Sequence, residues 1–221
     1  MRRPIAWALA ISSASAAQPM SAVLAGGGIG GLCAALTLRK AGIDVSVYEK
    51  TSEYRPFGGP IQIASNGLEA LAQIDRGLLD DIRAAGTTIG DRKNGLKDGI
   101  SNEWFATFDL YSPAISRGQE PSLVIDRPIL QDLLLKRVGD SVTKGTEVVG
   151  CERNDDADRS VAALLADGSR HSTDLLIGSD GLRSKVTPAY RRAPRRRAAP
   201  HAPSAHSNTP RPAPRSRCAP C

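Results

Sequence analysis

The residues best suited to chemistry lie in one short stretch, from Gly26 to Glu49. The stretch matches the pattern GxGxxGxxxAxxLxxxGxxVxVxE at every specified position. This pattern is typical of a βαβ unit that binds a dinucleotide, with the diphosphate at the amino end of the helix. In such a unit Gly26 permits a tight turn, Gly28 lets the diphosphate approach the backbone, and Gly31 lets the helix pack closely on the strand.

Glu49 predicts which dinucleotide is bound. A carboxylate at this position accepts hydrogen bonds from the ribose hydroxyls of the adenosine and repels a 2′-phosphate. The stretch therefore favours FAD or NAD over NADP. The alternative is a glycine-rich turn that holds no ligand.

The hydrophobic pattern predicts the elements that position these residues. An apolar strand over 22–25 leads into the glycines, a helix follows over 29–41, and Val45 and Val47 alternate in a strand over 44–49. These three elements form a complete βαβ unit.

The rest of the pattern predicts an α/β chain with inserted antiparallel strands. Asp126 is predicted to cap a helix whose first turn contains Pro128. Further helices are expected over 66–74 and 78–85, and strands over 104–110, 146–152, 161–165 and 174–178.

A second motif lies at the end of the last of these strands. The apolar run ends in Asp180-Gly181, and Arg183 and Ser184 follow directly. An Asp-Gly pair after a strand is more often a turn than a site. Its position downstream of the dinucleotide pattern favours a functional site over a simple turn.

Both ends of the chain differ in composition from its middle. Residues 1–20 carry two Arg, an apolar run and then small residues, which predicts a targeting leader; the alternative is a frayed extension. Residues 187–221 contain eight Arg and eight Pro but no Lys, Asp or Glu, so they account for more than the whole net charge of +6. We expect a disordered tail there, and 21–186 as the domain.

Nucleic acid and metal are not expected as partners. The basic tail has one aromatic residue and no amphipathic period, so neither a nucleic-acid nor a membrane-surface role is supported. The pair Cys218 and Cys221 has metal-ligand spacing, but no second pair or suitably spaced His accompanies it.

Three segments between the two motifs carry a resemblance to a known family. They are YRPFGGPIQIASNGLEAL (54–71), GDRKNGLKDGISNEWFATFD (90–109) and VIDRPILQDLL (124–134). With the two motifs they resemble the aromatic-hydroxylase-type FAD monooxygenases, and within these the zeaxanthin epoxidases of photosynthetic organisms. The resemblance implies a Rossmann-like FAD-binding domain.

The resemblance also implies roles for individual residues. Gly26, Gly28, Gly31 and Glu49 would bind the adenosine end of FAD, Arg127 would contact the flavin cofactor, and Asp180 and Gly181 would lie near the cofactor and the reductant. No catalytic side chain is expected, because in such enzymes the flavin performs the oxygen chemistry.

The implied reaction is epoxidation of the β-ring of a xanthophyll, a carotenoid, with dioxygen. Electrons would come from NADPH, directly or through a carrier, at a plastid membrane that the protein contacts peripherally. The alternatives are another FAD-dependent hydroxylase or oxidoreductase, and a non-enzymatic nucleotide-binding remnant.

The chain departs from the family after Val186. The family's later Gly-Asp segment, which contacts the flavin ribityl and diphosphate, has no counterpart. We therefore expect a domain that is incomplete at its C-terminus, from a truncated gene product or a gene-model error, with weak or no turnover.

Overall fold

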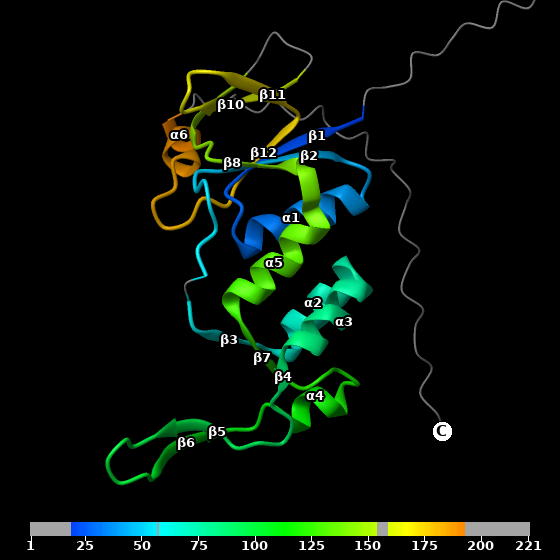
Figure 1. The fold of residues 1–221 in the computed structure, drawn as a ribbon, viewed down its shortest axis with the longest axis vertical. Helices are drawn as coiled ribbons and strands as arrows, with labels where there is room; N and C mark the ends of the chain where they lie inside the picture. Colours follow the sequence, from blue (N-terminus) through cyan, green and yellow to red (C-terminus); the bar gives the residue numbers. More distant parts are fainter. Residues whose placement is uncertain (1–18, 57, 154–158, 193–221) are drawn as a thin grey trace, which may run out of the picture.

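The structure is a computed structural model that describes residues 19–56, 58–153 and 159–192 (Figure 1). Most of the predicted leader and the tail from residue 193 onward lie outside the described residues, as do Cys218 and Cys221.

A four-stranded parallel sheet forms the centre of the fold. Its strand order is β12-β1-β2-β8, and the strands are β1 (Ser21–Ala25), β2 (Asp44–Glu49), β8 (Val142–Lys144) and β12 (Leu175–Gly178). Helix α1 (Ile29–Lys40) connects β1 to β2. The predicted βαβ unit is therefore confirmed to within one residue at each boundary.

Alternate residues of β1 face two different layers. Ala22 and Leu24 pack in a core with the helices, whereas Val23 and Ala25 pack in a second core with an antiparallel sheet. The period of two along a strand produces this division. The helix nearest to α1 is α5 (Arg127–Val138), and the antiparallel sheet consists of β9 (Val148–Arg153), β10 (Val161–Leu165) and β11 (Arg170–Thr173).

A second group of elements extends the helical layer away from the parallel sheet (Figure 1). Helices α2 (Ser65–Ile74) and α3 (Arg76–Ala85) add Leu68, Leu78 and Ile82 to the helical core. The other elements here are β3 (Pro60–Ile63), β4 (Thr87–Thr88), β7 (Leu123–Asp126) and α4 (Ser112–Ser116). The short 3-10 turn η1 (Gly139–Ser141) lies instead between α5 and β8, beside β2 of the parallel sheet.

One hairpin projects from the end of this group in Figure 1. It consists of β5 (Asn94–Lys97) and β6 (Trp104–Phe108), which pair only with each other among the described residues. The inserted antiparallel strands predicted around Trp104 are therefore present.

Two details differ from the predictions. Asp126 occupies the position before α5, but its side chain makes no capping hydrogen bond, so the predicted cap is wrong in its chemistry. Pro128 in the first turn and the extended conformation of Asp126 start the helix without it. Helix α6 (Val186–Arg192) occupies the first residues of the segment predicted as a disordered tail, because the buried side chain of Val186 attaches that turn to the second core.

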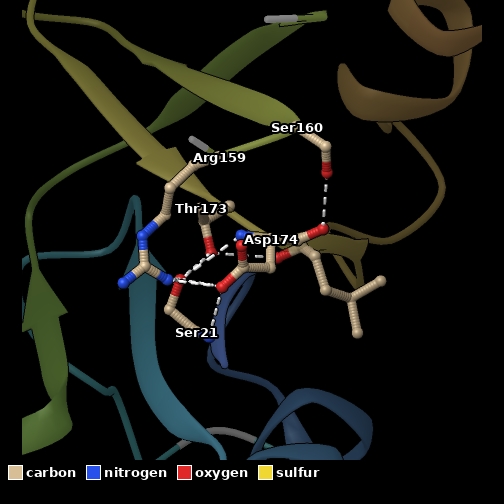
Figure 2. Close-up of polar contacts among 6 residues, drawn as sticks. Ser21, Arg159, Ser160, Thr173 and Asp174 are labelled. Atoms are coloured by element: carbon tan, nitrogen blue, oxygen red, sulfur yellow. Dashed lines mark hydrogen bonds and ion pairs between the residues drawn. The ribbon is translucent and has the colours of Figure 1, made fainter. Parts of the chain in front are cut away.

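A polar cluster fixes the start of β1 (Figure 2). The Asp174 carboxylate accepts hydrogen bonds from the Ser21 backbone N–H (2.7 Å) and the Ser21 hydroxyl (3.1 Å), and it forms an ion pair with Arg159. The Ser21 N–H, and after it Arg159, lower the pKa of Asp174. The cluster ties β1 to the junction of β11 and β12, at the opposite end of the strand from the glycines.

Candidate dinucleotide-binding site

The site begins where β1 ends and the chain turns sharply at Gly26. Gly26 has a φ of +104°, which L side chains rarely adopt, and its N–H donates to the Tyr48 carbonyl over 2.8 Å. The Ser179 hydroxyl donates to the carbonyls of Ala25 (2.8 Å) and Gly26 (2.9 Å). A Cβ at Gly26 would lie 2.4 Å from the Ser179 carbonyl oxygen, so only glycine fits this turn.

The other two glycines of the pattern have opposite surroundings. Gly31 is buried in the first turn of α1, and a Cβ there would lie 2.0 Å from the Gly26 carbonyl oxygen. Gly28 faces open space, with nothing within 4 Å of where its Cβ would stand. The fold itself therefore requires Gly26 and Gly31, whereas Gly28 leaves room in front of the backbone for another molecule.

Glu49 closes the site from the end of β2. Its two carboxylate oxygens accept hydrogen bonds from the backbone N–H groups of Gly27 (2.7 Å) and Thr51 (2.9 Å). A carboxylate has further acceptor positions beyond these two bonds, so Glu49 can still accept from a ligand hydroxyl. The bond to Gly27 also joins the second strand directly to the glycine loop.

Two hollows adjoin at Gly28 and Glu49, which line both of them. The smaller has a volume of about 210 Å³, and the larger has a volume of about 540 Å³. Gly26, Asp180 and Gly181 line the smaller hollow, and Arg127 lines the larger. The structure therefore brings every predicted site residue to these hollows except Gly31, which supports the loop from beneath.

Charge of both signs surrounds the hollows. The basic side chains that line them come from Lys50, Arg183 and Lys185 on the smaller and from Arg55 and Arg127 on the larger. The acidic residues are Glu49, Glu147, Asp180 and Asp132. Arginine is well suited to a diphosphate, because its planar group can donate two parallel hydrogen bonds.

Asp180 turns its side chain toward its own backbone. Its carboxylate accepts from the N–H groups of Lys185 (2.6 Å) and Val186 (3.3 Å), at the start of α6. Partial burial acts to raise the pKa of Asp180, but the hydrogen bonds, with that of Lys185 the strongest, outweigh it and lower the pKa. Gly181 beside it has a φ of +77°, so the Asp-Gly pair is a glycine-dependent turn as well as a lining of the smaller hollow.

Two residues that the sequence did not single out contact the glycine loop. The Tyr54 hydroxyl donates to the Gly27 carbonyl over 3.0 Å, and the Gln131 side-chain amide donates to the same oxygen over 2.7 Å. Both residues line the larger hollow. Gln131 lies one helical turn after Arg127, and this spacing is the signal that could have indicated it.

The residues present fit FAD. A dinucleotide needs an elongated site with room for its diphosphate against the helix amino end, and the two hollows meet at the open face of Gly28. Gly28 stands at the N-cap of α1 and makes no side-chain capping bond, and the first-turn N–H groups of a helix, which have no acceptor inside it, can donate to phosphate oxygens.

The described residues contain neither a cluster suited to a metal ion nor a helix suited to a membrane. No group of three or more His, Cys, Asp or Glu side chains there could hold a metal ion. Within the same ranges, no helix has the length and apolar character needed to cross a membrane.

The fold and the site together define a Rossmann-type dinucleotide-binding domain. The chain belongs to the FAD binding domain family, which it matches over residues 20–198. FAD is therefore its cofactor class, and the sequence-based assignment of an α/β FAD-binding domain is confirmed.

Two of the proteins similar to this chain are named chloroplastic zeaxanthin epoxidases. The chain is 45% identical over 174 residues to the chloroplastic zeaxanthin epoxidase of Solanum lycopersicum, covering 76% of this chain and 26% of the relative. It is 46% identical over 164 residues to that of Arabidopsis thaliana, covering 72% and 24%. The chain thus spans about a quarter of the length of these relatives.

Two solved structures have a fold similar to that of this chain. The fold is similar to Klebsiella pneumoniae HpxO complexed with FAD and uric acid, with a TM-score of 0.64 and 35% identity over 76% of this chain and 41% of that one. It is also similar to a tetrameric form of 2-methyl-3-hydroxypyridine-5-carboxylic acid oxygenase, with a TM-score of 0.62 and 30% identity over 78% and 42%.

Proposed function

We propose that this chain supplies the FAD-binding part of an FAD-dependent monooxygenase of the zeaxanthin epoxidase type. The observation that carries the proposal is the 45% identity over 174 residues to a zeaxanthin epoxidase. The intact glycine loop supports it, because Gly26 and Gly31 keep their steric roles and Gly28 stays open. The proposed limits are a leader over 1–20, the domain over 21–186 and a tail over 187–221, whose first residues continue helix α6.

Each site residue has a proposed role toward FAD. Gly26, Gly28 and Glu49 bind the adenosine and diphosphate end, and Gly31 allows the helix amino end to approach it. Arg127 lines the larger hollow together with Gly28 and contacts the remainder of the cofactor. Asp180 and Gly181 border the smaller hollow, near the cofactor and the reductant.

The chemistry is proposed by analogy with the relatives. When bound, the flavin would supply the transfer of one oxygen atom from dioxygen to the β-ring of a xanthophyll, with electrons from NADPH or a reduced carrier. The described residues bind and orient the cofactor in this scheme, and none is proposed as a catalytic acid, base or nucleophile.

Localisation follows from the same relatives, whose names call them chloroplastic. We therefore propose a plastid location, with a carotenoid and dioxygen as partners and peripheral contact with a plastid membrane. A fluorescent protein fused behind the 221-residue chain would test this by its position in the cell.

A second candidate function is hydroxylation of a small heterocyclic ring. The specific observation in its favour is the similarity to HpxO complexed with uric acid at 35% identity, and to a hydroxypyridine oxygenase at 30% identity. The identity to the zeaxanthin epoxidases is higher, so we rank this candidate second.

A domain exchange separates the two candidates. Residues 21–186 would replace the matching segment in the tomato zeaxanthin epoxidase, and in a second chimera the matching segment of HpxO. We expect the first chimera to bind FAD and to form zeaxanthin epoxide, with one oxygen atom from labelled dioxygen in the product. The same chimera carrying Gly28→Asp is the control and should lose FAD.

The outcomes have distinct meanings. Epoxide from the first chimera and no urate oxidation by the second would support the epoxidase assignment. Urate oxidation by the second chimera alone would favour the hydroxylase. A folded first chimera without bound FAD would contradict both candidates and leave a nucleotide-binding remnant as the better description.

A further inference from the structure

Gly27 is held by side chains from three separate elements or loops, and two of them bind the peptide between Gly27 and Gly28. Its carbonyl oxygen accepts hydrogen bonds from the Gln131 amide (2.7 Å) and the Tyr54 hydroxyl (3.0 Å). The preceding N–H, that of Gly27 itself, donates to Glu49 over 2.7 Å. Gly27 is buried, so these bonds form away from bulk solvent.

The Gly27–Gly28 peptide can rotate more freely than most, so contacts with other residues must fix its orientation. It is flanked by two glycines, which lack the Cβ that limits backbone rotation, so the chain alone would allow several orientations. In a planar trans peptide the carbonyl and the following N–H point in roughly opposite directions. Bonds that hold the Gly27 carbonyl inward therefore aim the Gly28 N–H away from Gln131 and Tyr54.

The two donors are themselves well fixed. Gln131 is only 8% exposed, on the face of α5 that packs against the glycine loop. Burial, and then the nearby Glu49, raise the pKa of Tyr54 to about 12, so its hydroxyl keeps the donated proton. The Lys144 ammonium lies 5.3 Å from the centroid of the Tyr54 ring, which adds a cation–π contact on that ring.

Burying a glutamine amide is unfavourable unless it is hydrogen-bonded. Here the Gln131 amide donates to the Gly27 carbonyl, 104 positions away in the sequence. The next residue after Gly27 is Gly28, which lines both hollows. The bond therefore connects a helix of the core to the orientation of a single peptide at the site.

We propose that Gln131 and Tyr54 are positioning residues that orient the Gly27–Gly28 peptide so that the Gly28 N–H donates to the diphosphate of FAD. This rests on the proposed FAD site. Neither side chain needs to touch the diphosphate, because both act through the Gly27 carbonyl.

The test compares FAD affinity of the full 221-residue chain with that of two variants. Gln131→Met and Tyr54→Phe remove one donor each with little change of shape, and each should weaken FAD binding by about tenfold, as expected for loss of one buried hydrogen bond. Matched controls are Gln73→Leu, whose amide donates to Glu69 on the surface of α2, and Tyr111→Phe beside α4; both should bind like the wild type.

A second readout separates positioning from general support of the fold. In protein labelled with ¹⁵N-glycine, the Gly28 amide signal, assigned by its absence in Gly28→Ala, should shift on addition of FAD or ADP. ADP carries the diphosphate without the flavin. In Gln131→Met that shift should be lost or strongly reduced, while the other glycine signals and the unfolding midpoint stay close to the wild type.

Three results would count against the proposal in different ways. Wild-type affinity in both variants would overturn it. Weaker binding with an unchanged Gly28 shift would show that the residues only support the fold, and would overturn it as well. Absence of FAD binding by the wild type would instead refute the proposed function, and the inference with it.

Discussion

The glycine loop and the β5–β6 hairpin are built in opposite ways. The loop between Gly26 and Gly31 is connected to β2, to α5 and to the segment after β12. Its Gly27 N–H donates to Glu49, and its carbonyls accept hydrogen bonds from Gln131 and Ser179. The hairpin pairs only with itself among the described residues, and Ile100 and Phe105 are 99% and 72% exposed.

The loop is held by contacts with several other elements, whereas the hairpin depends mainly on its own two strands. The loop takes its conformation from contacts distant in sequence, so a change in any of several elements would alter it. An isolated two-stranded hairpin is only marginally stable in water, and this one has few supports beyond Lys93 and Lys97, whose ammonium groups lie 5.5 and 5.1 Å from the Trp104 ring centroid. We therefore expect substitutions to matter far more in the loop.

The largest effect is expected for Gly31→Ala. The new Cβ would stand 2.0 Å from the Gly26 carbonyl oxygen, which is backbone and cannot move without opening the turn. We predict a loss of about 3 kcal/mol or more in the free energy of unfolding, at the upper end for an overpacked site. Urea denaturation followed by circular dichroism would measure it.

The control for this prediction is Gly30→Ala, one residue earlier in the same helical turn. Nothing lies within 4 Å of a Cβ there, so alanine should be neutral or slightly stabilising. If Gly31→Ala were as stable as Gly30→Ala, the close packing of α1 on the Gly26 turn would be wrong.

A moderate effect is expected for Asp180→Ala. The variant loses the hydrogen bonds that Asp180 accepts from Lys185 and Val186, which should reduce the free energy of unfolding by about 1–2 kcal/mol. The exposed Asp132→Ala on α5 is the matched control and should change stability little.

The same carboxylate predicts a pH dependence. Because folding lowers the pKa of Asp180, its contribution is complete above the ordinary aspartate pKa and is lost as the pH falls through the lowered folded value. The stability gap between wild type and Asp180→Ala should therefore narrow on acidification. A gap that stayed constant down to the lowest pH at which the chain folds would contradict the assigned hydrogen bonds.

The smallest effect is expected in the hairpin. Phe105→Ser removes an aromatic ring that is largely exposed, so the free energy of unfolding should change by no more than about 0.5 kcal/mol. A loss above about 1 kcal/mol, as a buried ring would give, would show that the hairpin is packed against something and would remove the contrast with the loop.

The sequence predicted the local part of this fold well. The bounds of β1, α1 and β2 followed from apolar periodicity and from the glycines at each end, because those signals lie within a few residues of what they specify. The sheet of β3, β7 and β4 was not predicted, since its pairs join residues about 35 to 66 positions apart and no local pattern encodes that pairing.

In the site, too, the sequence predicted the residues of one local pattern and missed those placed by contacts between distant segments. Gly26, Gly28 and Glu49 belong to one continuous pattern, and the structure brings them together at the two hollows. Gln131 and Tyr54 were missed because their contact with Gly27 depends on how α5 and the segment after β2 fold back over the loop. Asp126 was expected to cap α5 from its residue type and position, but its side chain makes no such bond.

The central claim is that the glycine loop of this chain binds FAD. The most direct measurement is equilibrium titration of the purified 221-residue chain with FAD, followed by quenching of flavin fluorescence, beside Gly28→Asp and Glu49→Ala. We predict saturable binding of one FAD per chain, abolished by Gly28→Asp, which places a carboxylate in the open space before the loop, and weakened by Glu49→Ala. No binding by the wild type, or equal binding by Gly28→Asp, would contradict the claim.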